Sequence, residues 1–159
     1  LLALAGLIPS TGRLGWFGSD TPIDEPGHII HYSGHRHALK PELSLAENLA
    51  FWADLFGGDK ALIAPALAAA GLAGLGPFAT RNLSAGQAHR LALCRLSISP
   101  RPVWLLDEPS SALDTEGDAW VASLIDDHLN RNGLVVAATH RAIPLAPGRT
   151  ATLDLGSGK

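Results

Sequence analysis

Two uninterrupted apolar runs stand out in the second half of the chain. Residues 103–106 and 134–138 contain no polar position, which is typical of strands buried on both faces of a sheet. Between them, from about Thr115 to Asn132, apolar residues recur at helical spacing, and Gly133 ends the pattern. A strand, a helix and a second strand in this order predict a βαβ unit, and therefore a parallel sheet.

The first half of the chain is mostly helical by the same criteria. Ser44 and Glu47 have the spacing of a capping box, in which each side chain satisfies a backbone N–H of the other residue. They open an amphipathic helix whose apolar stripe includes Trp52 and Phe56, and Gly57 ends it. Comparable patterns predict helices at about 60–70 and 85–97 and short strands at 13–17, 28–32 and 150–155.

The order of these elements predicts two parts. Residues 41–97 form a helical block between strands, which we interpret as an inserted helical subdomain; residues 1–40 and 98–159 would form one α/β core. The chain opens without Met on an apolar stretch that has the pattern of the last turns of a helix, with Gly6 as its end. We therefore expect the sequence to be N-terminally truncated.

Composition narrows the possible functions. The chain has 159 residues, of which 47% are hydrophobic, and this suits a globular domain with a core. Its formal net charge of -3 gives no reason to expect a nucleic-acid partner. No apolar run approaches the ~20 residues of a membrane-spanning helix, so contact with a membrane would pass through a partner. The single Cys94 excludes an internal disulfide and is expected to be a packing residue.

The most specific motif is Leu83-Ser84-Ala85-Gly86-Gln87, which is followed at once by a predicted helix. Small residues there leave backbone N–H groups accessible at a helix N-terminus, beside a serine hydroxyl. This arrangement suits an anion such as phosphate. Taken alone, such a motif is far more often an ordinary serine N-cap.

Polar residues follow both apolar runs. Asp107 and Glu108 come directly after the first run, at a strand end where open α/β sheets bind ligands. Asp107 could hold Mg²⁺ through water, and Glu108 could polarise an attacking water. His140 follows the second run and could bond a terminal phosphate. The alternatives are solvated carboxylates and a structural histidine, but the order and spacing of all these motifs make a chance assembly untenable.

Together, these motifs resemble those of the ABC-type ATPases, over essentially the whole chain. Residues 83–87, with Arg90 on the next helix, resemble the ABC signature motif, and residues 103–108 resemble the Walker B strand. Residues 111–114 resemble the D-loop, and His140 resembles the switch histidine. The resemblance implies a P-loop NTPase-like α/β fold with an inserted helical subdomain, with ATP and Mg²⁺ as cofactors.

The same resemblance implies roles for these residues. Glu108 would be the general base, Asp107 would hold Mg²⁺ through water, and His140 would steady the γ-phosphate. Two subunits would dimerise head to tail, so that the signature motif of one completes the ATP site of the other. The implied nucleotide-binding residues are Ser84, Ala85, Gly86, Gln87 and Asp114.

A narrower resemblance lies in residues 32–35, 39–44, 47–49 and 51–52, together with the signature motif. These segments resemble the haem-exporter ATP-binding subunits of bacterial cytochrome c maturation. That likeness implies a peripheral protein on the cytoplasmic face of the inner membrane, with integral-membrane partners. An ATPase of another exporter is one alternative. A pseudo-ATPase interaction module is another, against which the presence of Glu108 and His140 argues.

Three features depart from the family pattern. No Gly-x-x-x-x-Gly-Lys-[Ser/Thr] loop occurs in the 159 residues, and the closing residues 156–159 do not supply it, because position 153 is Leu. We therefore expect these residues alone to be inactive. Arg36 falls at or near the position of a glutamine that meets Mg²⁺, and Arg cannot ligate a metal, so it is given no role. Ala85 stands where many relatives have glycine.

Four histidines lie close together at positions 28, 31, 35 and 37. Clustered histidines can bind a metal, but no cysteine or carboxylate stands among them at zinc-like spacing. His28 and His31 would also point to opposite faces of a predicted strand. The pattern therefore favours no metal site, and Trp104, inside the first apolar run, is expected to be a core residue.

Overall fold

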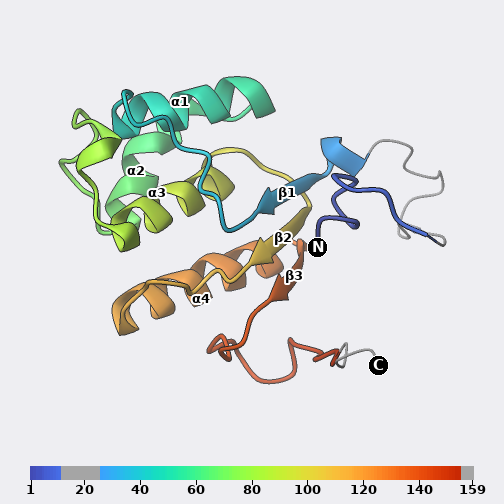
Figure 1. Cartoon of the computed structure of the whole chain (residues 1–159). Coiled ribbons are helices and arrows are strands. Elements are labelled where there is room, and N and C mark those ends of the chain that lie inside the picture. The colour runs from blue at the N-terminus through green and yellow to red at the C-terminus, as the bar shows by residue number, and fades with distance from the viewer. Residues whose placement is uncertain (12–25, 155–159) are drawn as a thin grey trace.

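The computed structural model describes residues 1–11 and 26–154. It is an α/β structure around one sheet of three parallel strands in the order β1-β2-β3 (Figure 1). The strands are β1 (Ile30–Ser33), β2 (Val103–Asp107) and β3 (Leu134–Ala138). The central strand, β2, is the first apolar run, and it is buried on both faces as predicted.

The predicted βαβ unit is present. Helix α4 (Thr115–Asn130) connects β2 to β3, and the two strands pair in parallel with Val103 opposite Leu134 and Asp107 opposite Ala138. Asp114 caps α4 by accepting a hydrogen bond from Gly117 N–H. The helix therefore begins where a side chain satisfies one of its free N–H groups.

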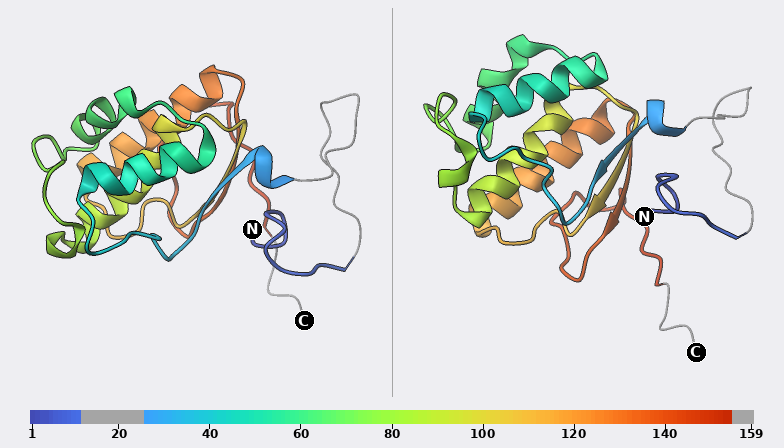
Figure 2. Two further views of the ribbon diagram at one scale, coloured as in Figure 1. Left: turned by 90° about the horizontal axis from the view of Figure 1, so that it is seen from above. Right: turned by 45° about the horizontal axis from the view of Figure 1, so that its top comes forward.

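The two faces of the sheet are covered differently. On one face, Trp104 and Leu106 of β2 pack against helices α3 (Ala85–Ile98) and α4, which lie on the same side of the strands (Figure 2). On the other face, Val103 and Leu105 contact the first residues of the chain. Those residues form a helical turn that ends at Gly6, whose φ of 70° favours glycine.

The helical block builds a second core. Helix α1 (Leu45–Phe56) has the predicted capping box, and α2 (Ile63–Ala69) follows a 3₁₀ turn, η2 (Lys60–Leu62), that Asp59 caps. Helices α1, α2 and α3 pack around a shared set of buried residues, namely Leu45, Leu49, Ala53, Ala66, Leu67, Ala70, Leu72, Leu91, Cys94 and Ile98. Helix α3 belongs to both cores, because its opposite side packs on the sheet.

Cys94 is a packing residue, as expected. It is fully buried in α3, where its thiol lies 3.5 Å from the carbonyl oxygen of Ala66. Burial raises the pKa of this thiol to about 12, so it stays protonated and unreactive.

Two predictions about strands need correction, and a third is not tested. The second apolar run is not buried on both faces: Leu134 is 50% exposed, and Ala137 and Ala138 are exposed as well. The reason is that β3 lies at the edge of the three-stranded sheet in the part of the chain that the structure describes. Residues 150–154 form no strand, and the strand expected at 13–17 lies outside the described residues.

Candidate active site

The carboxyl ends of β2 and β3 meet at one edge of the sheet. Asp107 lies opposite Ala138, and the N–H of Glu108 donates to the carbonyl oxygen of Ala138 at 2.8 Å. This pairing brings Glu108 beside Thr139 and beside His140, which is 32 residues further along the chain. The parallel register therefore joins the two motifs that the sequence placed at separate strand ends.

The carboxylate of Glu108 accepts three hydrogen bonds from the end of β3. Nδ1 of His140 lies 2.9 Å from Oε2, the backbone N–H of His140 donates to Oε1 at 3.2 Å, and the Thr139 hydroxyl donates to Oε2 at 3.3 Å. Since a carboxylate only accepts, Nδ1 carries the proton. The His140 side chain is the main cause that lowers the pKa of Glu108. Glu108 is thus ionised at neutral pH, as a proton acceptor must be.

The loop that follows β2, residues 108–114, has an unusual backbone. Both Glu108 and Ala112 have positive φ, 50° and 59°, a left-handed conformation that is uncommon for residues other than glycine. Such a conformation persists where the surroundings fix it. One fixing contact comes from Arg141, which donates to the carbonyl oxygen of Ser110 at 3.3 Å. We call this segment the post-β2 loop.

The signature motif opens α3 with a capping box. Ser84 Oγ accepts from the N–H of Gln87 at 3.2 Å, and Gln87 Oε1 accepts from the N–H of Ser84 at 3.0 Å. The interpretation as an N-cap is therefore correct, and it is compatible with anion binding. As in the first turn of any helix, the N–H groups of Ala85 and Gly86 have no acceptor within α3.

The signature helix contacts the post-β2 loop of its own chain. A Cβ atom at Gly86 would lie 2.9 Å from the carbonyl oxygen of Ala112, so the position has to be glycine for this approach. One turn on, Arg90 pairs with Asp114 at 2.6 Å. The bond from Gly117 N–H is the main cause that lowers the pKa of Asp114. Asp114 thus caps a helix and pairs with α3 within one subunit.

Asp107 is half-buried at the last position of β2. Among the described residues, no group of three His, Cys, Asp or Glu side chains could hold a metal ion. Direct binding by protein ligands alone is therefore not available to Asp107 here. A single carboxylate fits Mg²⁺, which keeps several of its waters and shares them with substrate phosphates.

The four histidines of the first half do not gather around one point. His28 lies in a 3₁₀ turn (Pro26–His28) before β1, so the prediction that it shares a strand with His31 is wrong. His31 is buried, and its Nε2 lies 2.7 Å from the carbonyl oxygen of Ser99. Burial is the main cause that lowers its pKa to about 4. His37 instead faces His89, with ring centroids 5.0 Å apart.

Three polar residues at this end of the molecule were not predicted from the sequence. His89 is buried, and its Nε2 lies 2.8 Å from the carbonyl oxygen of Pro109. Arg95 is buried in α3 and donates to the carbonyl oxygen of Tyr32 at 3.0 Å. The third is Arg141. Only proximity to a motif could have indicated two of them, since Arg141 follows His140 and His89 lies two residues after Gln87.

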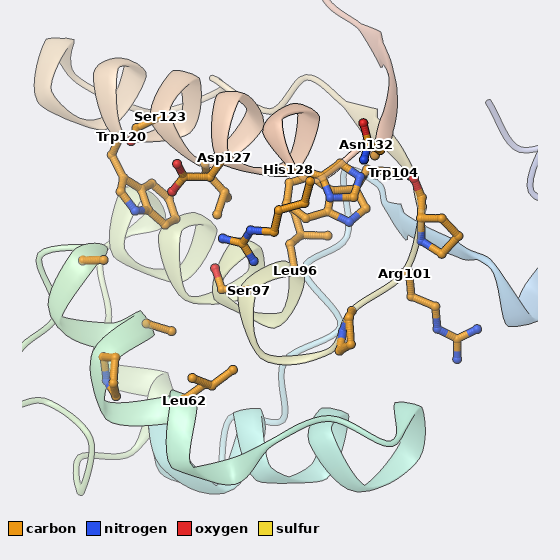
Figure 3. Close-up of a pocket in the computed structure, with 18 residues that line it drawn as sticks. Leu62, Leu96, Ser97, Arg101, Trp104, Trp120, Ser123, Asp127, His128 and Asn132 are labelled. Carbon is orange, nitrogen blue, oxygen red and sulfur yellow. Dashed lines mark hydrogen bonds between the residues drawn. The ribbon is translucent and has the colours of Figure 1, made fainter.

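A hollow of about 530 Å³ lies at the other end of β2, between α2, α3 and α4 (Figure 3). The ring of Trp104 stacks there on that of His128, with centroids 3.7 Å apart and planes at 8°. Its lining contains neither Glu108 nor His140. The candidate chemistry therefore lies on the open carboxyl edge of the sheet and not in this hollow.

The chain is similar to a known protein family and to individual proteins. The family described as ABC transporter matches residues 1–111. A cytochrome c biogenesis ATP-binding export protein, CcmA, of Rhodopseudomonas palustris (strain HaA2) is 49% identical over 143 residues, which are 88% of this chain and 70% of that protein. The protein of the same name from Bradyrhizobium diazoefficiens is 48% identical over 144 residues, 90% of this chain and 72% of that protein.

Solved structures show the same fold. A dimeric ATP-binding cassette in a post-hydrolysis state, bound to ADP and Pi, superposes with a TM-score of 0.63 at 24% identity. The match covers 70% of this chain and 52% of that chain. A structure titled RNase-L Inhibitor gives a TM-score of 0.62 at 24% identity, with coverage of 86% of this chain and 25% of that chain. No helix in residues 1–11 and 26–154 has the length and apolarity to cross a bilayer.

Proposed function

The chain belongs to the ABC transporter family, and on that premise we propose that it is the ATP-hydrolysing subunit of an exporter in cytochrome c biogenesis. The observation that carries the proposal is the contact between Glu108 and His140, because it joins a carboxylate to a histidine at the carboxyl edge of a parallel sheet. The shared name of the relatives supports this pathway.

The residues at this edge have the chemistry that ATP hydrolysis needs. Glu108, ionised and half-buried, would accept the proton of the attacking water. His140, which is exposed, would turn from Glu108 to the γ-phosphate when nucleotide is bound. Asp107 would hold Mg²⁺ through water, and this ion would neutralise charge that develops on the phosphate oxygens.

A second ATP-binding subunit would complete the site. We assign Ser84, Ala85, Gly86 and Gln87 to the nucleotide bound by that partner, since Ser84 and Ala85 are exposed at the N-terminus of α3. Asp114 would stand at the same interface, held in place by Arg90. Residues 41–97 would form the helical subdomain that presents the motif.

An integral-membrane subunit would dock on α1. Phe51 and Leu55 of this helix are 45% and 57% exposed. The half-buried rings of Trp52 and Phe56 stack beside them, with centroids 5.3 Å apart. This apolar surface would receive a cytoplasmic segment of the partner, and the protein would then be peripheral to the inner membrane. The cargo would be haem or a related compound. An exporter of another cargo is the alternative within the same class.

The decisive experiment is an ATPase assay of the complete gene product and its Glu108→Gln variant. Because a general base contributes about 10²- to 10⁴-fold, we expect the variant to lose at least about a hundredfold in kcat while it still binds ATP. Glu116→Gln is the matched control, since that carboxylate is exposed in the first turn of α4. We also expect the 159 residues by themselves to be inactive, as they contain no P-loop lysine.

Two outcomes would contradict this proposal in different ways. Turnover that is insensitive to Glu108→Gln would favour an interaction module without catalysis. The second outcome combines two results: hydrolysis depends on Glu108, but a strain without the gene still forms its c-type cytochromes normally. Together these results would favour an exporter of another cargo.

A further inference from the structure

His89 forms a hydrogen bond with the carbonyl oxygen of Pro109, the residue that directly follows Glu108. It lies in α3, is 5% exposed, and its Nε2 is 2.8 Å from the carbonyl oxygen of Pro109. A carbonyl oxygen only accepts, so Nε2 must carry a proton. Burial is the main cause that lowers the pKa of His89. The ring is therefore neutral at neutral pH and fixed as a single tautomer.

Pro109 follows a residue with an unfavourable backbone conformation, and few groups are available to fix its position. It is fully buried and has no N–H of its own, so its carbonyl oxygen is its only backbone hydrogen-bonding group. It follows Glu108, whose left-handed φ of 50° is unfavourable for a non-glycine residue. The carbonyl oxygen of Glu108 accepts from the N–H of Ser111 at 2.9 Å within the loop. That of Pro109 is held from outside the loop, by His89.

The ring of His89 is itself confined. His37 packs edge-on against it with ring centroids 5.0 Å apart. The guanidinium of Arg95 and the ring of His35 are near enough to oppose a positive charge on His89. Its hydrogen bond to Pro109 favours the charged form, but by less than burial opposes it. The surroundings therefore keep His89 in one position and one protonation state.

Helix α3 connects this contact to the signature motif. Gly86, His89 and Arg90 all face the post-β2 loop, and they meet Ala112, Pro109 and Asp114 respectively. Of these three residues, His89 is the one that contacts Pro109, the residue directly after Glu108 in the chain. A rigid helix thus presents the signature motif at its first turn and holds the base-bearing loop at its second.

From these contacts we infer that His89 is a positioning residue for Glu108. Its hydrogen bond to Pro109 fixes the left-handed backbone from which the carboxylate of Glu108 reaches the attacking water. The inference rests on the proposed function, in which Glu108 is the general base. His89 would act on Glu108 only through the post-β2 loop, by its bond to Pro109.

The test compares three substitutions of His89 by steady-state ATPase kinetics on the complete gene product. His89→Ala should lower kcat about tenfold or more, because small misplacement of a reacting group is costly, and should leave the KM for ATP within about twofold. His89→Gln should recover most of kcat, since its amide N–H can donate to the same carbonyl oxygen. His89→Asn, whose shorter amide falls short of it, should resemble the alanine variant.

His128→Ala is the matched control. Nε2 of His128 lies 3.2 Å from the carbonyl oxygen of Pro102, so the same kind of bond is made at the opposite end of β2. Its loss should lower the melting temperature without a specific fall in kcat. If an alanine variant does not fold, the comparison of kcat between His89→Gln and His89→Asn tests the same hydrogen bond.

The outcomes separate the two proposals. If Glu108→Gln is inactive but His89→Ala retains as much kcat as His128→Ala, the positioning role is wrong and the proposed function stands. Equal impairment of His89→Gln and His89→Asn would also overturn the positioning role. If Glu108→Gln turns over normally, both proposals fail, because there is no base to position.

Discussion

The amino and carboxyl ends of β2 differ in what surrounds them. At the amino end, Trp104 is 4% exposed, stacks on His128, and lies against the buried residues of α3 and α4. At the carboxyl end, Glu108 is half-buried, has a left-handed backbone, and is held by hydrogen bonds to Thr139 and His140. Both ends contain a histidine that bonds a proline carbonyl oxygen.

This difference separates stability from chemistry along one strand. Apolar burial supplies most of the free energy of folding, and within β2 it is concentrated at the amino end and in the middle of the strand. The carboxyl edge keeps an ionised carboxylate and an exposed histidine, which contribute little to stability. Substitutions at the amino end should therefore change the free energy of unfolding, and those at the carboxyl edge should change turnover.

The largest effect on stability is expected for Trp104→Ala. Truncation of a buried tryptophan removes its packing on α3 and α4 and should cost about 3–5 kcal/mol in free energy of unfolding. Urea denaturation measures this cost. Leu134→Ala, at the exposed start of β3, is the control and should cost about 1 kcal/mol or less. Similar costs for the two variants would contradict the comparison.

The buried His31, which lies in β1 opposite Trp104, should make the free energy of unfolding depend on pH. Burial lowers the pKa of His31 from 6.5 to about 4, so the unfolded chain takes up a proton first as the pH falls. The contribution of His31 to the free energy of unfolding is therefore fully present above about pH 6.5 and is lost progressively as the pH falls towards 4. Between pH 7 and pH 5 this residue should account for about 2 kcal/mol of the lost free energy of unfolding.

The measurement is urea denaturation at both pH values for the parent and for His31→Gln. The variant keeps a donor for the carbonyl oxygen of Ser99 but has no group that titrates in this range. Its stability should fall less between pH 7 and pH 5 than that of the parent. Equal falls would show that His31 is not the source.

The smallest effects come from two matched helix caps. Ser44 and Ser84 both form capping boxes, with α1 and α3 respectively. Replacement of either by alanine should cost about 1 kcal/mol of stability. Only Ser84→Ala should also lower ATPase turnover, because we assign that hydroxyl to the partner's nucleotide. A fall in turnover for Ser44→Ala of the same size would remove the reason for that assignment.

Local patterns in the sequence predicted the elements well where the cause is local. The capping residues Ser44 and Ser84 begin helices in the structure, because each side chain satisfies an N–H only a few residues away. The apolar run of β2 and its parallel pairing with β3 were predicted for a related reason, since the intervening helix sets the crossover. The ABC motifs then identified the family.

Burial was harder to predict than secondary structure. The runs of β2 and β3 are equally apolar, yet β2 is buried and Leu134 of β3 is 50% exposed. The composition of a strand does not record whether it lies in the middle of a sheet or at its edge. The same limit explains His28, whose place before β1 depends on where strand pairing begins.

The sequence by itself determined the helix caps, the parallel βαβ unit and the motifs that mark an ABC ATPase, because these depend on neighbours within a few residues or on fixed spacing. Only the tertiary structure decided that His140 pairs with Glu108 and that His89 holds Pro109. Sequence separations of 32, from Glu108 to His140, and of 20, from His89 to Pro109, leave no periodic signal. Such contacts follow from strand register and helix packing, which the whole fold fixes at once.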